Sequence, residues 1–136
     1  MLIALALGVL GSTACASSSR QAASPVVVAD QRLSGTWRLR RFAPEVALDL
    51  PLQAVLASEL GNLTVTFGSG QFTATGPGVN LSGRYSVLSA QGDAIEVVVY
   101  DPDGVARHFT AQFVGTVLTF HAEDKPWQGD GALQRA

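Results

Sequence analysis

The chain has 136 residues, of which 47% are hydrophobic and only 15% are charged. Nine basic and 11 acidic side chains give a net charge of −2, which provides no net attraction for nucleic acid or for an anionic bilayer. The length allows one compact domain, and a single cysteine excludes an intramolecular disulfide and a cysteine-based zinc site.

The N-terminal segment is apolar and carries no charged side chain before Arg20. An unbroken apolar run from Leu2 to Leu10 fits the hydrophobic region of about 7–15 residues in a secretory signal peptide. It is shorter than the roughly 20 apolar residues that a membrane-spanning helix needs. We therefore predict a signal peptide over residues 1–14, followed directly by the lone Cys15.

An apolar run, small residues and then a single cysteine resemble the lipobox of bacterial lipoproteins. The resemblance implies that Cys15 is diacylated, that it becomes the mature N-terminus, and that the protein is attached to a membrane of the cell envelope, with the outer membrane as the expected site. Ser12 stands where lipoboxes usually carry leucine. The alternative is an ordinary secretory signal that is cleaved near Ala14 or Ala16.

Residues 16–25 are mostly small and polar, so we expect residues 15–32 to form a flexible tether and residues 33–136 to form the domain. The apolar residues Val26 to Val28 belong either to this tether or to a short additional strand.

From Leu33 onward, apolar and polar residues alternate, and turn residues interrupt the pattern about every 8–12 positions. This pattern predicts eight antiparallel strands, the first of which places Trp37, Leu39 and Arg41 on one face. The predicted inward-facing residues are Trp37, Leu39, Leu63, Val65, Phe67, Phe72, Tyr85, Val87, Ile95, Val97, Val99, Phe109, Phe113, Leu118, Phe120 and Leu133.

Residues 49–61 break the alternation, because their apolar positions 52, 55, 56 and 60 follow helical spacing. Asp49 is suited to cap the start of this helix, and Gly61 is suited to end it. We expect this helix, between the first two strands, either to cover one end of a barrel or to pack as an ordinary surface helix.

Eight sequential antiparallel strands would leave two exposed edges in an open sheet, and closure removes both. The predicted fold is therefore an all-β, small up-and-down antiparallel barrel of about eight strands with one short helix between strands 1 and 2. A barrel of this size holds its own side chains or one small ligand. The structural alternative is an open, strongly curved sheet wrapped around the helix.

The domain begins with the motif Gly35-Thr36-Trp37 and ends with Arg135. This pair resembles the Gly-x-Trp opening and the terminal basic residue of lipocalins and of smaller lipocalin-like (calycin-type) domains. The resemblance implies that Trp37 closes one end of the barrel, that Arg135 lies across its ring, and that the barrel binds a small hydrophobic ligand. A helix after the barrel, usual in full lipocalins, is missing from the sequence. A second resemblance, to META-type domains of exported bacterial proteins, covers residues 78–85 but lacks their cysteine.

Arg107 is predicted to share the inward face with Phe109 and Phe113. A buried arginine needs a carboxylate partner or an anionic ligand, so these three residues and Tyr85 are the predicted ligand contacts. The alternatives are a position at the barrel rim for Arg107 and an ordinary core position for Tyr85.

His108 and His121 are predicted to face outward, with Glu96, Glu123 and Asp124 as the nearest carboxylates. We interpret these residues as solvated surface groups rather than as a metal site or a catalytic group.

The segment from Asp101 to Gly104 resembles the start of a calcium loop but lacks the later ligands, so we expect a hairpin turn there.

We expect no cofactor and no enzymatic activity. The predicted function is binding of a small hydrophobic or amphipathic ligand, and the alternative is a structural module that docks to another envelope protein.

Overall fold

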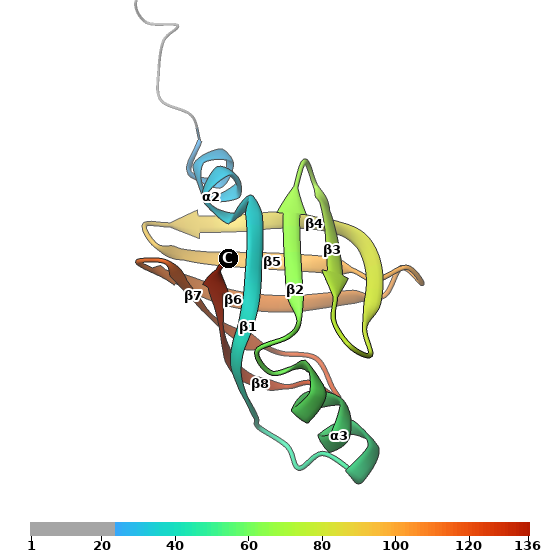
Figure 1. The fold of residues 1–136 in the computed structure, drawn as a ribbon. Helices are drawn as coiled ribbons and strands as arrows, with labels where there is room; N and C mark the ends of the chain where they lie inside the picture. Colours follow the sequence, from blue (N-terminus) through green and yellow to red (C-terminus); the bar gives the residue numbers. More distant parts are fainter. Residues whose placement is uncertain (1–23) are drawn as a thin grey trace, which may run out of the picture.

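The computed structural model describes residues 24–136, so the predicted signal peptide and Cys15 lie outside the described residues. Eight antiparallel strands pair in sequence order, and β8 returns to β1 (Figure 1), which confirms the predicted closed barrel. The strands are β1 (Gly35–Pro44), β2 (Thr64–Gly68), β3 (Gln71–Thr75), β4 (Asn80–Gln91), β5 (Ala94–Tyr100), β6 (Ala106–Val114), β7 (Val117–Ala122) and β8 (Gly129–Arg135).

A helix, α2 (Pro25–Leu33), precedes the barrel, and the expectation of a flexible tether is therefore wrong for residues 25–32. Ser24 caps this helix by accepting a hydrogen bond of 3.2 Å from the backbone N–H of Val27. Ala29 and Leu33 are only 3% and 1% exposed, because α2 packs across one end of the barrel. The other apolar residues of the helix are largely exposed, so its sequence carries little hydrophobic signal.

The predicted helix between the first two strands is α3 (Leu50–Glu59), and Asp49 caps it as expected by accepting from the N–H of Leu52 at 3.2 Å. It lies at the end of the barrel opposite α2 (Figure 1). Its predicted apolar face is only partly packed, since Leu52 and Leu56 are half-buried and Val55 and Leu60 are 39% and 37% exposed. Within residues 24–136, neither helix has the length and hydrophobicity needed to cross a membrane.

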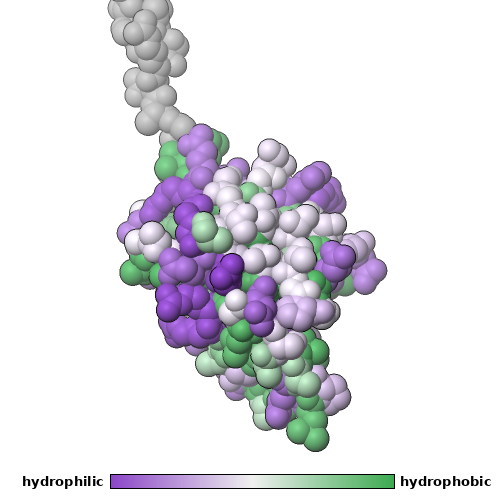
Figure 2. All heavy atoms as spheres, viewed as in Figure 1, coloured by the Kyte–Doolittle hydropathy of each residue, from purple (hydrophilic) through white to green (hydrophobic). Residues whose placement is uncertain are grey.

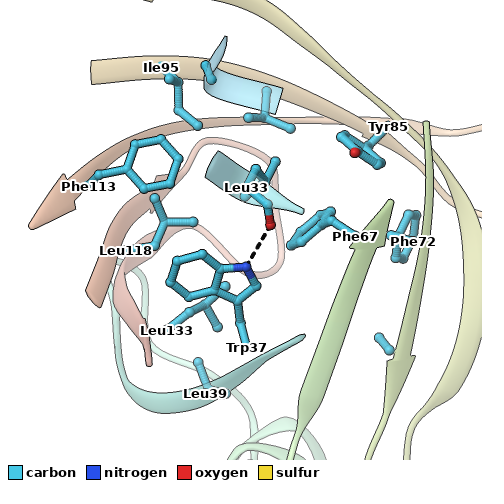
Figure 3. Close-up of a cluster of buried hydrophobic side chains, with 13 residues drawn as sticks. Leu33, Trp37, Leu39, Phe67, Phe72, Tyr85, Ile95, Phe113, Leu118 and Leu133 are labelled. Carbon is cyan, nitrogen blue, oxygen red and sulfur yellow. Dashed lines mark hydrogen bonds between the residues drawn. The ribbon is translucent and has the colours of Figure 1, made fainter. Parts of the chain in front are cut away.

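A cluster of buried side chains lies at the α2 end of the barrel, around the almost fully buried Trp37 (Figure 3). The indole Nε1 of Trp37 donates a hydrogen bond of 2.8 Å to the carbonyl oxygen of Leu33, which fixes α2 against the start of β1. The alternation of apolar and polar residues predicted ten of the thirteen buried core residues, whereas Ala29, Leu33 and Ala74 were not in the predicted inward set. The buried members of this core are Ala29, Leu33, Trp37, Leu39, Phe67, Phe72, Ala74, Tyr85, Ile95, Val97, Phe113, Leu118 and Leu133.

A β-bulge between Leu39 and Arg41 changes the register of β1 against β8. The extra residue reverses the alternation of the strand beyond it. The predicted inward position of Arg41 is therefore wrong, because Arg41 is exposed and Phe42 packs against the core instead.

Candidate functional site

The interior of the barrel is incompletely filled, and a cavity of about 470 Å³ lies between the core at the α2 end and helix α3. Its wall is built almost wholly from aliphatic and aromatic side chains of the strands, and α3 contributes Val55, Leu56 and Glu59. At the α3 end the wall includes exposed residues, so this end is the mouth of the cavity.

The polar side chains of the cavity wall lie at this mouth, and they are Glu59, Asp101, Arg107, His108 and Asp124. The Nη2 atom of Arg107 is 3.6 Å from Oδ2 of Asp101, which makes a loose ion pair. The other oxygen of Asp101 accepts from the backbone N–H groups of Asp103 and Val105 at 3.0 and 2.9 Å, so the predicted hairpin turn fixes this carboxylate. Arg107 has five N–H donors, and among residues 24–136 its guanidinium has no ion-pair or hydrogen-bond partner besides Asp101, so most of these donors can bind a ligand.

Glu59 is the one buried residue of α3, with 3% of its surface exposed. Its Oε1 accepts a hydrogen bond of 2.7 Å from the N–H of Gly78, in the loop between β3 and β4. Its Oε2 has no hydrogen-bond partner among the residues that the structure describes. Glu59 therefore connects the end of α3 to the opposite side of the cavity mouth, and sequence reasoning did not identify it.

The four predicted ligand contacts divide between the two ends of the barrel. Arg107 and Phe109 line the cavity, whereas Tyr85 and Phe113 pack in the core at the α2 end. The Tyr85 hydroxyl donates to Oδ1 of Asp30 at 2.6 Å. Burial of Tyr85, reinforced by the hydrogen bond and the charge of Asp30, raises its pKa from 10.0 to about 12. The hydroxyl of Tyr85 thus has a structural role, because it holds α2 against β4.

The predicted closure of the barrel is present at the α2 end. The guanidinium carbon of Arg135 lies 4.2 Å from the centroid of the Trp37 ring, and the backbones of these residues pair between β1 and β8. Gly35 has a φ of 122°, and a Cβ atom there would lie 2.7 Å from Nη1 of Arg135. The positive φ therefore favours glycine at this position, and a Cβ atom there would also push the Arg135 guanidinium out of its place.

Each of the two histidines lies beside its own carboxylate. Nδ1 of His108 is 3.5 Å from Asp124, and Nδ1 of His121 is 2.8 Å from Asp130. The hydrogen bond that Oδ1 of Asp130 accepts from the His121 ring raises the pKa of His121 above its usual value. No three His, Cys, Asp or Glu side chains within residues 24–136 form a group suited to hold a metal ion.

The remaining carboxylates of the predicted outward set, Glu96 and Glu123, are exposed and line neither the cavity nor the groove beside α3. Glu96 pairs across to Thr110, which pairs in turn with His121, so two strand spacings of about 4.8 Å separate Glu96 from His121. The backbone N–H of Glu123 bonds to the carbonyl oxygen of His108, and its side chain is exposed.

Two aromatic residues of the cavity were absent from the predicted inward set. Phe42 is turned inward by the bulge in β1, and Trp127 comes from the loop between β7 and β8. Neither position follows the simple alternation of a strand, so only their aromatic character was visible in the sequence.

Comparisons with models of protein families, with curated proteins and with solved structures find no match for this chain.

Proposed function

We propose that this protein binds a small hydrophobic or amphipathic ligand inside its barrel, and that lipid on Cys15 holds it at a membrane of the cell envelope. The observation that supports ligand binding is the apolar cavity of about 470 Å³ in a fold of this small size. Ligand sites in proteins generally measure about 300–1,000 Å³ and combine an apolar wall with a few polar groups. The cavity has this composition.

Arg107 is the group we assign to the polar end of an amphipathic ligand. It lies at the mouth, beside the interior ring of Phe109, and its only ionic contact within the described residues is the 3.6 Å pair with Asp101. A planar guanidinium binds carboxylates and phosphates through two parallel hydrogen bonds. The apolar part of such a ligand would then lie along the inner wall.

Native mass spectrometry of the protein as its own host produces it tests both parts of the proposal. We expect a mature chain that begins at an acylated Cys15 and carries an additional small molecule. Ala111 lines the cavity, and its neighbour Thr110 is exposed on the outside of the same strand. Ala111→Phe should lose the bound molecule, while the matched control Thr110→Phe should keep it. A wild-type protein without any bound molecule, and equal retention by both variants, would each count against ligand binding.

A second candidate function is docking to another envelope protein through α3. Hydrophobic residues gather on this part of the surface (Figure 2), where Val46 and Leu50 are 47% and 78% exposed. A shallow groove of about 420 Å³ runs between α3 and the segment that precedes it. Leu50→Gln would abolish co-purification of a protein partner if docking is the function, and it would leave a bound small molecule in place if the cavity is the functional site.

A further inference from the structure

The walls of the cavity differ chemically from one side to the other. Its outer part carries four partly buried rings on β1, β6, β7 and the loop after β7, namely Phe42, Phe109, Phe120 and Trp127. The facing wall, on β2, β3, β4 and the segments beside them, carries mainly aliphatic side chains, namely Leu63, Val65, Ala74, Val79 and Leu81. Phe67 and Phe72 also reach the cavity, but they are buried and Phe67 packs edge-on against Tyr85 at 5.1 Å.

The four rings of this aromatic wall form one continuous row. Trp127 meets Phe42 edge-on with 6.1 Å between the ring centroids. Phe42 stacks on Phe120 at 6.1 Å with an angle of 17° between the ring planes, and Phe120 meets Phe109 edge-on at 6.1 Å. The row begins at Trp127 in the loop after β7 and ends at Phe109 on β6.

Strand β8 holds the two central rings in place because it carries glycine beneath them. A Cβ atom at Gly131 would lie 2.4 Å from Cζ of Phe120, and one at Gly129 would lie 2.9 Å from Cζ of Phe42. Both rings therefore lie directly against the backbone of β8, and they still keep part of their surface open. The bulge in β1 and the glycines in β8 together position these rings on the cavity wall.

We infer that the ligand of this cavity carries a flat, unsaturated ring system that stacks on the aromatic wall, with an anionic group at Arg107. This inference rests on the proposed ligand-binding function and narrows its ligand class. Aromatic faces carry negative charge density and aromatic edges carry positive charge density, so a ligand ring gains offset or edge-on contacts that a saturated ring of similar size lacks. The expected preference for the unsaturated ring is about two- to tenfold in Kd.

Calorimetric titration of the full-length protein with two probes tests this inference. The probes are ω-phenylhexanoate and ω-cyclohexylhexanoate, which share a carboxylate and a chain length and differ only in the ring. We expect the phenyl probe to bind about two- to tenfold more tightly than the cyclohexyl probe. Phe42→Leu and Phe120→Leu should remove this preference, mainly by weakening the phenyl probe. Phe113→Leu is the matched control, because Phe113 is buried outside the cavity and its loss should leave the preference intact.

Thermal unfolding of each variant shows whether it is folded before the affinities are compared. Equal affinity for the two probes, or a preference that persists in both Phe42→Leu and Phe120→Leu, would overturn the assignment of an aromatic ligand and leave the proposed binding function standing. Failure of both probes to bind the wild-type protein would overturn the inference and the proposed function together.

Discussion

The Tyr85 hydroxyl donates a hydrogen bond of 2.6 Å to Oδ1 of Asp30, and this bond joins β4 to the helix that seals the barrel. Burial and the neighbouring carboxylate favour the protonated phenol, so the pKa of Tyr85 is raised from 10.0 to about 12. The stabilisation is complete below pH 10.0 and is lost as the pH rises through the folded-state pKa of about 12.

We therefore predict that the free energy of unfolding falls by roughly 2–3 kcal/mol between these two pH values. Tyr85→Phe should lower the stability at neutral pH by about 1–2 kcal/mol and should remove the part of the alkaline loss that belongs to this group. Urea unfolding at a series of pH values provides the measurement. The same alkaline slope in wild type and Tyr85→Phe would contradict the assignment.

Removal of the Arg135 guanidinium should weaken the seam between the first and last strands. Its stacking on Trp37 is accompanied by hydrogen bonds to the carbonyl oxygens of Ser34 and Arg32. Because Arg135 is exposed, we expect Arg135→Ala to cost about 1–2 kcal/mol in the free energy of unfolding. Arg135→Lys keeps the charge but loses the planar contact with the Trp37 ring, so its stability should lie between that of the wild type and that of Arg135→Ala. Chemical denaturation with tryptophan fluorescence as the signal checks this order.

Glu59 and Gly76 should show strong energetic coupling. A Cβ atom at Gly76 would lie 1.8 Å from Oε2 of Glu59, and the carboxylate cannot move freely while Oε1 holds the N–H of Gly78. We predict that Gly76→Ala costs about 1–3 kcal/mol in the wild-type background and clearly less in a Glu59→Ala background. A double-mutant cycle by urea unfolding measures the coupling. Additive effects would show that the two residues are not in contact in solution.

His121 should titrate above the usual histidine pKa, since its Nδ1 lies 2.8 Å from Oδ1 of Asp130 and this hydrogen bond favours the imidazolium. Asp130→Asn should lower the pKa of His121 toward the ordinary value. The stabilisation from this pair is present below the unfolded-state pKa of about 6.5 and is lost as the pH rises through the higher folded-state value. NMR titration of the imidazole protons is the measurement, with His121→Gln to assign the signal. An unchanged pKa in Asp130→Asn would contradict the role of this carboxylate.

Most of the strand architecture was accessible from the sequence, because alternation depends on a period of two that glycine-containing turns interrupt at regular intervals. The inward positions of Trp37, Phe67 and Leu133 followed directly from that period, and the Asp49 cap defined the start of α3. The helix α2 was missed because its only buried side chains are Ala29 and Leu33, which are too few to set a hydrophobic pattern.

The cavity could not be predicted from the sequence, because the residues that form it are positioned by contacts that the local sequence pattern does not show. Phe42 faces inward because of a bulge that depends on the pairing of β1 with β8, and Trp127 reaches the mouth from a loop. Glu59 is buried because the loop before β4 lies beside it, and no sequence neighbour indicates this contact. Arg107 was identified because its position follows the regular alternation of β6.

The pairing of β1 with β8 also has a consequence for how the chain folds. Ser34 and Arg135, which meet at this seam, are 101 positions apart in the sequence. Such distant partners cannot meet until the chain has been synthesised through β8, and long-range strand pairing is slow to form. Until β8 arrives, the backbone edge of β1 and the aromatic interior stay open to other chains. The pairing of β8 (Gly129–Arg135) with β1 therefore ends the period in which the nascent protein is most prone to aggregate.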